Sequence, residues 1–238
     1  MQKKQLYYLS NGFTLIEIAI TLFIITLLLG GLLVPLGTQI EQRKISETQR
    51  NLEEIKEAMI GFALANGRLP RPANSNVDGN EKAVCTGANA SAMEQACTGF
   101  IPWATLGVPK LDAWGKVFRY SVTPAFANSS ITFVTTSTKT VQTRDATGSI
   151  ISLASSVPAV IISQGKNNWG IGDNGNAFAD TSATNTDEDT NNSASVTFIS
   201  RTQTDSGTAA TGGEFDDLVA WISPNILFSR MVAAGKLP

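Results

Sequence analysis

The sequence predicts an α+β protein in which a long N-terminal helix, transmembrane and then amphipathic, packs on a C-terminal antiparallel β-sheet. Two observations predict this class. Residues 13–65 form one long helical pattern, first apolar and then apolar on one side only. Residues 66–238 hold short β-branched segments separated by Gly, Pro, Asn and Ser. The 238 residues are enough for one globular domain together with such a helix.

The first part of the helix is almost wholly apolar. From Phe13 to Leu36 the only charged residue is Glu17, and a helix of this length rises about 36 Å, enough to cross a bilayer core. A secretory signal peptide has a shorter apolar stretch, followed by a cleavage site of small residues. We therefore predict a transmembrane helix over residues 13–38. Lys3 and Lys4 before it indicate a single pass with a cytoplasmic N-terminus.

The second part of the helix, residues 39–65, is amphipathic. Pro35, between the two parts, is expected to kink the helix or to melt one turn. Asn66-Gly67 is expected to end the helix, and the prolines that follow prevent it from resuming. The apolar residues recur at spacings of three, four or seven positions and form one stripe, which predicts packing on a sheet: Ile45, Leu52, Ile55, Met59 and Phe62.

The globular part, residues 66–238, is predicted to be a sheet of short strands. A short helix is predicted to follow Ser223-Pro224 and to end at Gly235. Residues 135–150 and 181–212 are dense in Ser, Thr, Asn and Asp, so they are predicted to bury little and to face solvent. The candidate strands are Lys116–Val122, Ile131–Thr136, Val157–Ser163, Ser195–Ser200 and Leu218–Ile222.

The composition excludes several classes of function. A net charge of −2 gives no basic surface for nucleic acid. The chain has no histidine, which removes Ser-His-Asp and Cys-His catalysis and most zinc sites, so we do not expect an enzyme. Cys85 and Cys97 are too few for a thiolate metal cage and the right number for one disulfide, which indicates an oxidising compartment.

The residues before the helix resemble a known processing signal. Gly12-Phe13-Thr14-Leu15-Ile16-Glu17, after a short basic leader, is similar to the prepilin motif of type IV pilins and type II secretion pseudopilins. The resemblance implies a pilin-like fold and a prepilin peptidase that cuts after Gly12, removes residues 1–12 and methylates the new amine of Phe13. It also implies that Glu17 pairs with the N-terminal amine of a neighbouring subunit. A buried carboxylate and a buried amine each need such a partner.

Two later segments extend this resemblance. Asn66-Gly67-Arg68-Leu69-Pro70 and Asp112-Ala113-Trp114-Gly115 are similar to segments of major type II pseudopilins, although Leu69 replaces an aromatic residue and Ala113 a proline. The implied location is the bacterial inner membrane, with the globular part in the periplasm or in an extracellular filament. The implied partners are the prepilin peptidase, other pilin or pseudopilin subunits, the inner-membrane assembly platform and membrane lipid.

Acidic and amide residues gather in the late loops of the chain. Oxygen-rich loops suit calcium, but residues 187–198 do not fit the EF-hand template. Major type II pseudopilins hold calcium in a loop between late strands. By that resemblance, a calcium site is expected where Asp173, in the loop 163–180, meets Asp216 and Asp217.

Three functions stay open at this point. A filament subunit, a minor pilin or pseudopilin of a type IV pilus or type II secretion filament, best explains the set of Gly12, Phe13 and Glu17. A filament-borne adhesin or other binding module of the same family is the alternative, and it would bind a ligand without assembly. A membrane-anchored hydrolase is the third, and no enzyme motif supports it.

Overall fold

The computed structural model describes residues 12–207 and 209–237, with the side chains of all of these except 29–36. The first eleven residues of the predicted leader, with Lys3 and Lys4, lie outside the described residues, as do side chains within the predicted span 13–38. The chain divides into two compact units, one up to Arg43 and one from Lys44 onward. Within the described part of the chain, no helix is both long enough and apolar enough to cross a bilayer.

A single helix, α1 (Leu15–Asn66), covers 52 residues and confirms the helix predicted over residues 13–65. Its backbone stays helical through Pro35, so no turn melts there; the proline removes one N–H from the ladder and leaves the neighbouring turns intact. The helix ends as predicted. Gly67 has a φ of 72° and its N–H donates to the Ala63 carbonyl at 2.8 Å, a left-handed cap that favours glycine.

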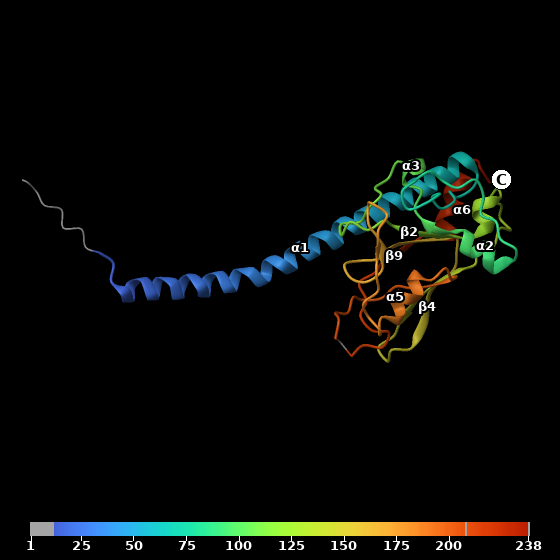
Figure 1. The fold of residues 1–238 in the computed structure, drawn as a ribbon. Coiled ribbons are helices and arrows are strands. Elements are labelled where there is room, and N and C mark those ends of the chain that lie inside the picture. Colours follow the sequence, from blue (N-terminus) through green and yellow to red (C-terminus); the bar gives the residue numbers. More distant parts are fainter. Residues whose placement is uncertain (1–11, 208, 238) are drawn as a thin grey trace, which may run out of the picture. The chain divides into compact units, whose positions relative to one another are not determined.

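The remaining elements belong to the unit from Lys44 onward, and their mixture confirms the α+β class (Figure 1). Five helices and nine strands follow α1 among the described residues. The helices are α2 (Ala90–Ala96), α3 (Trp103–Leu106), α4 (Pro124–Asn128), α5 (Thr186–Asn192) and α6 (Pro224–Ala233). The strands are β1 (Thr98–Phe100), β2 (Arg119–Val122), β3 (Lys139–Arg144), β4 (Ile150–Val157), β5 (Ala159–Ser163), β6 (Gly170–Ile171), β7 (Ala177–Phe178), β8 (Thr197–Ile199) and β9 (Leu218–Trp221).

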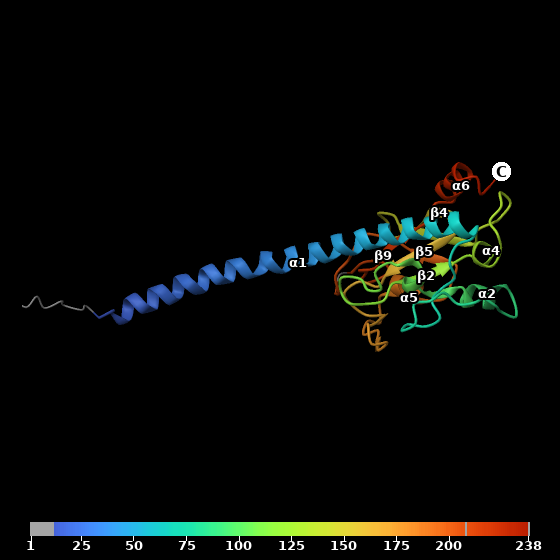
Figure 2. The same ribbon diagram turned by 90° about the horizontal axis from the view of Figure 1, so that it is seen from above.

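Two sheets and the last part of α1 form three layers. The main sheet is antiparallel, in the order β1-β2-β5-β9, and α1 runs along one of its faces (Figure 2). The stripe of α1 packs there against Tyr120 and Ile161, whose neighbours Val160 and Ile162 point to the opposite face. That opposite face packs on a second sheet, β4-β3-β8, in which β3 and β8 are parallel. A small antiparallel pair, β6-β7, forms a third sheet, so the single antiparallel sheet predicted from the sequence is three sheets among the described residues.

Four of the five predicted strands occur, as β2, β5, β8 and β9, and the strand over Ile131–Thr136 does not. There the chain makes a turn in which Thr135 donates its N–H to the Thr132 carbonyl and accepts the Thr132 N–H on its Oγ1. Phe133 and Val134 stay exposed. Local side chain to backbone bonds of this kind compete with strand pairing, which explains the wrong prediction.

Both stretches predicted to face solvent contribute to the core instead. Residues 135–150 contain β3, whose Val141 is fully buried against the main sheet. Residues 181–212 contain α5 and β8, and α5 buries Asp187, Glu188 and Asn191. The prediction fails because it equates polar side chains with solvent, whereas these find hydrogen-bond partners inside the fold.

The C-terminal helix α6 closes the core as predicted. Pro224 stands at its first turn, and Gly235, at a φ of 66°, follows its last turn. Ser223 occupies the N-cap position, but its side chain makes no capping hydrogen bond. Leu227 and Met231 are buried in the main core, whereas Ile226 and Val232, which the same helix carries, are exposed.

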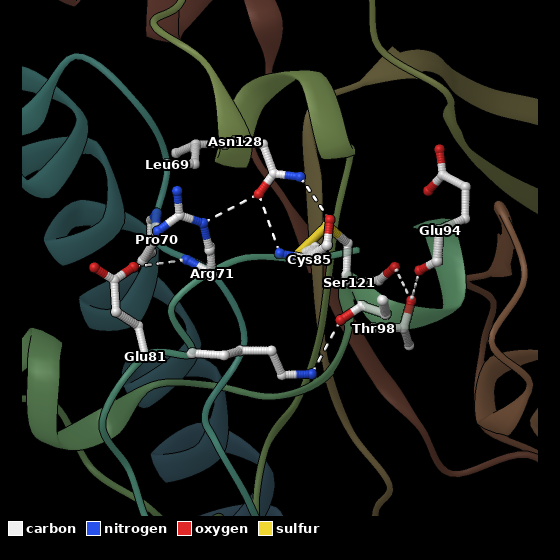
Figure 3. Close-up of a disulfide and its surroundings, with 12 residues drawn as sticks. Leu69, Pro70, Arg71, Glu81, Cys85, Glu94, Thr98, Ser121 and Asn128 are labelled. Carbon is white, nitrogen blue, oxygen red and sulfur yellow. Dashed lines mark hydrogen bonds between the residues drawn. A yellow bond between two sulfur atoms is a disulfide. The ribbon is translucent and has the colours of Figure 1, made fainter. Parts of the chain in front are cut away.

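The predicted disulfide is present between Cys85 and Cys97, and both cysteines are buried (Figure 3). It joins an irregular loop to the residue that ends α2. Asn128, at the end of α4, holds the loop side of the bond. Its Nδ2 donates to the Cys85 carbonyl at 2.8 Å, and its Oδ1 accepts the Cys85 N–H at 3.2 Å. The disulfide thus joins the loop to α2, and the hydrogen bonds of Asn128 attach both to α4.

Replacing both cysteines by serine should lower the free energy of unfolding by about 3 kcal/mol, because the bond closes a loop of about a dozen residues in the unfolded chain. Urea unfolding measures this loss. A reductant should destabilise the wild-type protein equally and leave the double-serine protein unchanged. Equal stability of the wild type with and without reductant would show that the bond contributes nothing.

Candidate functional site

The predicted processing site lies directly before α1. Gly12 and Phe13 are exposed and non-helical, so the peptide bond between them is accessible. Thr14 and Glu17 form a reciprocal cap. The Glu17 carboxylate accepts the Thr14 N–H and hydroxyl, both at 2.8 Å, while the Thr14 Oγ1 accepts the Glu17 N–H at 3.3 Å. This is a capping box, which fixes where the helix starts.

The first turns of the helix that follows this cap, residues 15–28, are mostly apolar, and all of their side chains are exposed. Phe13 and Leu15 are 85% and 87% exposed. A monomeric soluble protein rarely exposes an apolar surface of this extent, so another apolar surface must cover it. Other large side chains exposed on the same segment are Ile16, Ile18, Ile20, Leu22, Phe23, Ile24, Ile25, Leu27 and Leu28.

A second candidate site is a cluster of three carboxylates in the unit from Lys44 onward. Glu188 comes from α5, and Asp216 and Asp217 directly precede β9. One oxygen from each of the three lies within 4.8 Å of the others. Helix α5 carries Glu188 to this place because Asn191, one turn later, is anchored by accepting the Ile199 N–H and donating to Asp217.

Neutral donors surround these carboxylates. Glu188 Oε2 accepts from the side-chain amides of Asn168 and Asn185, and its Oε1 accepts the Asp216 N–H at 2.8 Å. Asp216 Oδ2 accepts the Asn167 N–H at 2.8 Å. Asp216 Oδ1 is buried without a hydrogen-bond partner among the described residues. Amides hold the carboxylates in place, but they do not neutralise the negative charge.

One ammonium group faces the cluster, that of the buried Lys116. Its Nζ donates to the carbonyls of Gln164, Asn167 and Asn168 at 2.6–3.1 Å, so it orders that loop rather than pairing closely with a carboxylate. Burial lowers the pKa of Lys116, although the nearby carboxylates, Asp216 first among them, act to raise it. Among the described residues, Lys116 and the guanidinium of Arg119, which interacts with Asp217, are the cations that act on the three carboxylates, so carboxylates outnumber cations.

Both aspartates of the cluster have a raised pKa, mainly because they are buried. Burial first of all, with a smaller contribution from the charge of Glu188, raises the pKa of Asp216 from 3.8 to about 7. Burial also raises the pKa of Asp217 well above its usual value, with smaller contributions from Glu188 and Asp216. The cluster can lower its energy by holding protons or by holding a cation.

The cluster fits a hard cation such as calcium. Calcium binds carboxylate oxygens at about 2.4 Å, so two of its ligands lie at most about 5 Å apart. The three carboxylates meet this condition. The structure brings together the predicted Asp216 and Asp217 but not Asp173, which is exposed and binds Lys110 at 2.7 Å.

Sequence reasoning misses Glu188, which takes the place expected for Asp173. The available signal is the acidic run from Asp187 to Asp189 in a helix-compatible stretch. Acidic residues are common in the first turn of a helix, and a helix at 186–192 would have pointed one of them inward. Asp187, in the same turn, is buried too, where it receives bonds from Arg144 and Arg201.

In the presence of a chelator, the protein should lose stability as pH rises from 5 to 8. With the raised pKa of Asp216, the folded chain keeps a proton that the unfolded chain has released, so folding is favoured at the lower pH. The carboxylates with lowered pKa values titrate below this window. The melting temperature measures the effect. Asp216→Asn should flatten the dependence of melting temperature on pH, whereas Asp205→Asn, at an exposed position, should leave it unchanged. A melting temperature that rises from pH 5 to 8 would contradict the prediction.

Comparison with known proteins does not place the chain in a family. No protein-family model, no curated protein and no solved structure matches it. The resemblance to type IV pilins therefore stays a prediction from the motif residues. Support for a function comes from the geometry of the segment Gly12–Glu17, of the apolar helix and of the acidic cluster.

Proposed function

We propose that the chain is a type IV pilin-like filament subunit, a minor pilin or pseudopilin, and that it acts structurally rather than as a catalyst. One observation carries the proposal. An accessible Gly12–Phe13 bond stands directly before the apolar first part of α1, in which Glu17 is the only charged residue up to Leu36. A prepilin peptidase would cut this bond, and the new terminus of Phe13 would begin the mature helix.

The apolar surface of α1 supports assembly because it needs a cover. In a single subunit the cover is the inner membrane, with the N-terminus cytoplasmic. In a filament the cover is the same segment of neighbouring subunits. Moving from lipid to a bundle of like helices keeps the apolar side chains out of water in both states.

Glu17 supports the same proposal by its position. In the uncut chain its carboxylate caps the helix through Thr14. Inside a bundle of apolar helices a carboxylate bound only to a neutral cap remains an uncompensated charge, at a cost of about 3–5 kcal/mol. The amine of a neighbouring Phe13 would neutralise it, and would do so at one axial offset only. The pair would therefore set the register between subunits.

The globular unit supports a pilin-like architecture outside the cytoplasm. The stripe of α1 that includes Leu52, Ile55 and Met59 lies on an antiparallel sheet, as in the fold that the motif implies. The disulfide is of the kind that forms in the periplasm or outside the cell. The partners in this account are the prepilin peptidase, the assembly platform and other subunits.

Replacing Glu17 should test whether its charge or its cap matters. Glutamine keeps the capping box, because Gln serves at that position as Glu does, but it removes the charge. Glu17→Gln should therefore reduce incorporation into sheared filaments as strongly as Glu17→Ala, while total membrane protein stays constant. Thr14→Val removes the hydroxyl of the cap and keeps the charge, so it should assemble. Normal incorporation of the Gln variant would show that Glu17 serves only as a cap.

The acidic cluster adds a proposed calcium site to this function. Calcium bound by Glu188, Asp216 and Asp217 would neutralise the excess charge and fix the entry of β9 against α5. Water molecules would complete the six to eight oxygens that calcium takes. A site that holds a late strand in place would stabilise the sheet on which α1 lies.

Calcium should raise the melting temperature, because it binds the folded chain. At a calcium concentration one hundred times the dissociation constant, the free energy of unfolding should rise by about 2.7 kcal/mol. The combined change Glu188→Gln and Asp217→Asn should abolish the rise. Asp173→Asn should leave it intact, because Asp173 binds Lys110 away from the cluster. A rise that depends on Asp173 and not on Glu188 would place calcium in the loop expected from the resemblance.

A further inference from the structure

Strands β9 and β4 are two of the strands that end a sheet of the globular unit. Strand β9 ends the main sheet and pairs only with β5, while β4 ends the second sheet and pairs only with β3. Ile150, Ile151 and Leu153 of β4 are 42%, 46% and 50% exposed, and the β3–β4 hairpin reaches away from the main sheet (Figure 1). An exposed apolar edge strand is a template for pairing with another strand.

The hydrogen bonds fix which peptide groups face outward on β9. Ile222 donates its N–H to the Ala159 carbonyl, and the register pairs Ala220 with Ile161. Bonded pairs alternate with non-bonded pairs in an antiparallel ladder, so the peptide groups of Val219 and Trp221 point away from β5.

The same reasoning applies to β4. Asp145 donates its N–H to the Ser149 carbonyl, and the register continues through Arg144 with Ile150 to Gln142 with Ser152. The peptide groups of Ile150 and Ser152 therefore point away from β3. Each open edge presents two outward peptide groups at a spacing of two residues, and the two sets match.

A groove accompanies the β9 edge. Two hollows of about 530 and 510 Å³ share Glu53, Val219 and Ala220, and lie between α1 and β9. Apolar side chains contribute to both, including Leu52 and Ile60 of α1. Ala220 leaves room beneath α1 because its side chain is a single methyl group.

We propose that the β4 edge of one copy pairs antiparallel with the β9 edge of a second copy of this chain. Ile150 then lies opposite Trp221, and Ser152 opposite Val219, which joins the outward peptide groups in four hydrogen bonds. Ile151 lies opposite Ala220 on the side of the sheet that faces α1. Its exposed side chain enters the hollow that Ala220 leaves.

The charges of the two edges are compatible with this occupant. Residues 150–157 contain no charged side chain. The charged side chains along the groove have partners within the unit. Glu53 pairs with Lys56 at 2.9 Å, Glu57 with Arg230 at 3.0 Å, and Arg201 with Asp187 at 2.6 Å, while Asp217 accepts a hydrogen bond from Asn191. An uncharged apolar strand can therefore bind in the groove without separating these partners, whereas a charged strand would bring in an additional, unpaired charge.

Pairing of two different edges makes a head-to-tail contact, which repeats from copy to copy instead of closing as a two-fold dimer. The inference rests on the proposed function in naming the second copy as the partner. The inference also goes beyond the proposed function, because it assigns the globular units a contact of their own, separate from the packing of the apolar helices.

Cysteine cross-linking tests the register. Opposite residues of a non-bonded antiparallel pair have Cα atoms about 4.5 Å apart, within the range of a disulfide. The full-length chain with both Ile151→Cys and Ala220→Cys, oxidised mildly in membranes and filaments, should give a ladder of multimers on a non-reducing gel. The single variants should give dimers at most. The pair Ser152→Cys and Ala220→Cys, which puts the thiols on opposite faces, should not give the ladder.

A second variant does not depend on changing the buried Ala220. Ile151→Asp alters an exposed side chain, so the unit should keep its melting temperature while incorporation into filaments falls. Wild-type incorporation of Ile151→Asp, or an equal ladder from the offset pair, overturns the strand pairing. If filaments form but the variant with Ile151→Cys and Ala220→Cys gives no ladder of multimers, the strand pairing is wrong and the proposed function is unaffected. If the wild type forms no filaments, the proposed function fails, and a missing ladder in membranes overturns the pairing as well.

Discussion

The packing of α1 is the constraint on which the rest of the structure depends. From Lys44 onward the helix carries a single apolar stripe, and that stripe is buried by the main sheet, with Ile55, Met59 and Ala63 fully enclosed. Over residues 15–28 the side chains are mostly apolar and all are exposed. One continuous helix thus has a cover of its own along one part and needs a cover from elsewhere along the other. A lipid bilayer and a bundle of identical helices are two surfaces that can supply it.

Charge inside the globular unit is mostly balanced in place. Lys139 is completely buried and bonds to Glu94, and Asp187 is held between Arg144 and Arg201. Burying such groups is tolerable only because each has its partner. The cluster of Glu188, Asp216 and Asp217 differs, since amides position it and its two nearby cations, Lys116 and Arg119, are fewer than its carboxylates. Protons or calcium can complete that balance, which makes the cluster the part of the fold most sensitive to solution conditions.

Local patterns in the sequence predict α1, β5, β9 and α6 because periodicity, a glycine cap or a proline start decides each of them. Local patterns fail where residues distant in the sequence determine the structure. Strand β3 has one fully buried apolar residue, Val141, and Lys139 beside it is buried only because Glu94 comes from α2. Glu188 reaches the acidic cluster through amides of Asn168 and Asn185, which no spacing in the sequence reveals. Ile131–Thr136 shows the reverse error, where β-branched residues form a turn.

The proposed function depends on which residue forms the N-terminus of the assembled protein. Mass spectrometry of the N-terminus of protein from sheared filaments tests this most directly. The account predicts a chain that begins at Phe13 with a methylated amine, without residues 1–12. Replacing Gly12 by leucine should prevent the cut, because a side chain would occupy a place where only a hydrogen stood. An assembled fraction that retains Met1 and an uncut Gly12–Phe13 bond would contradict the account, since Glu17 would then have no neighbouring Phe13 amine to pair with.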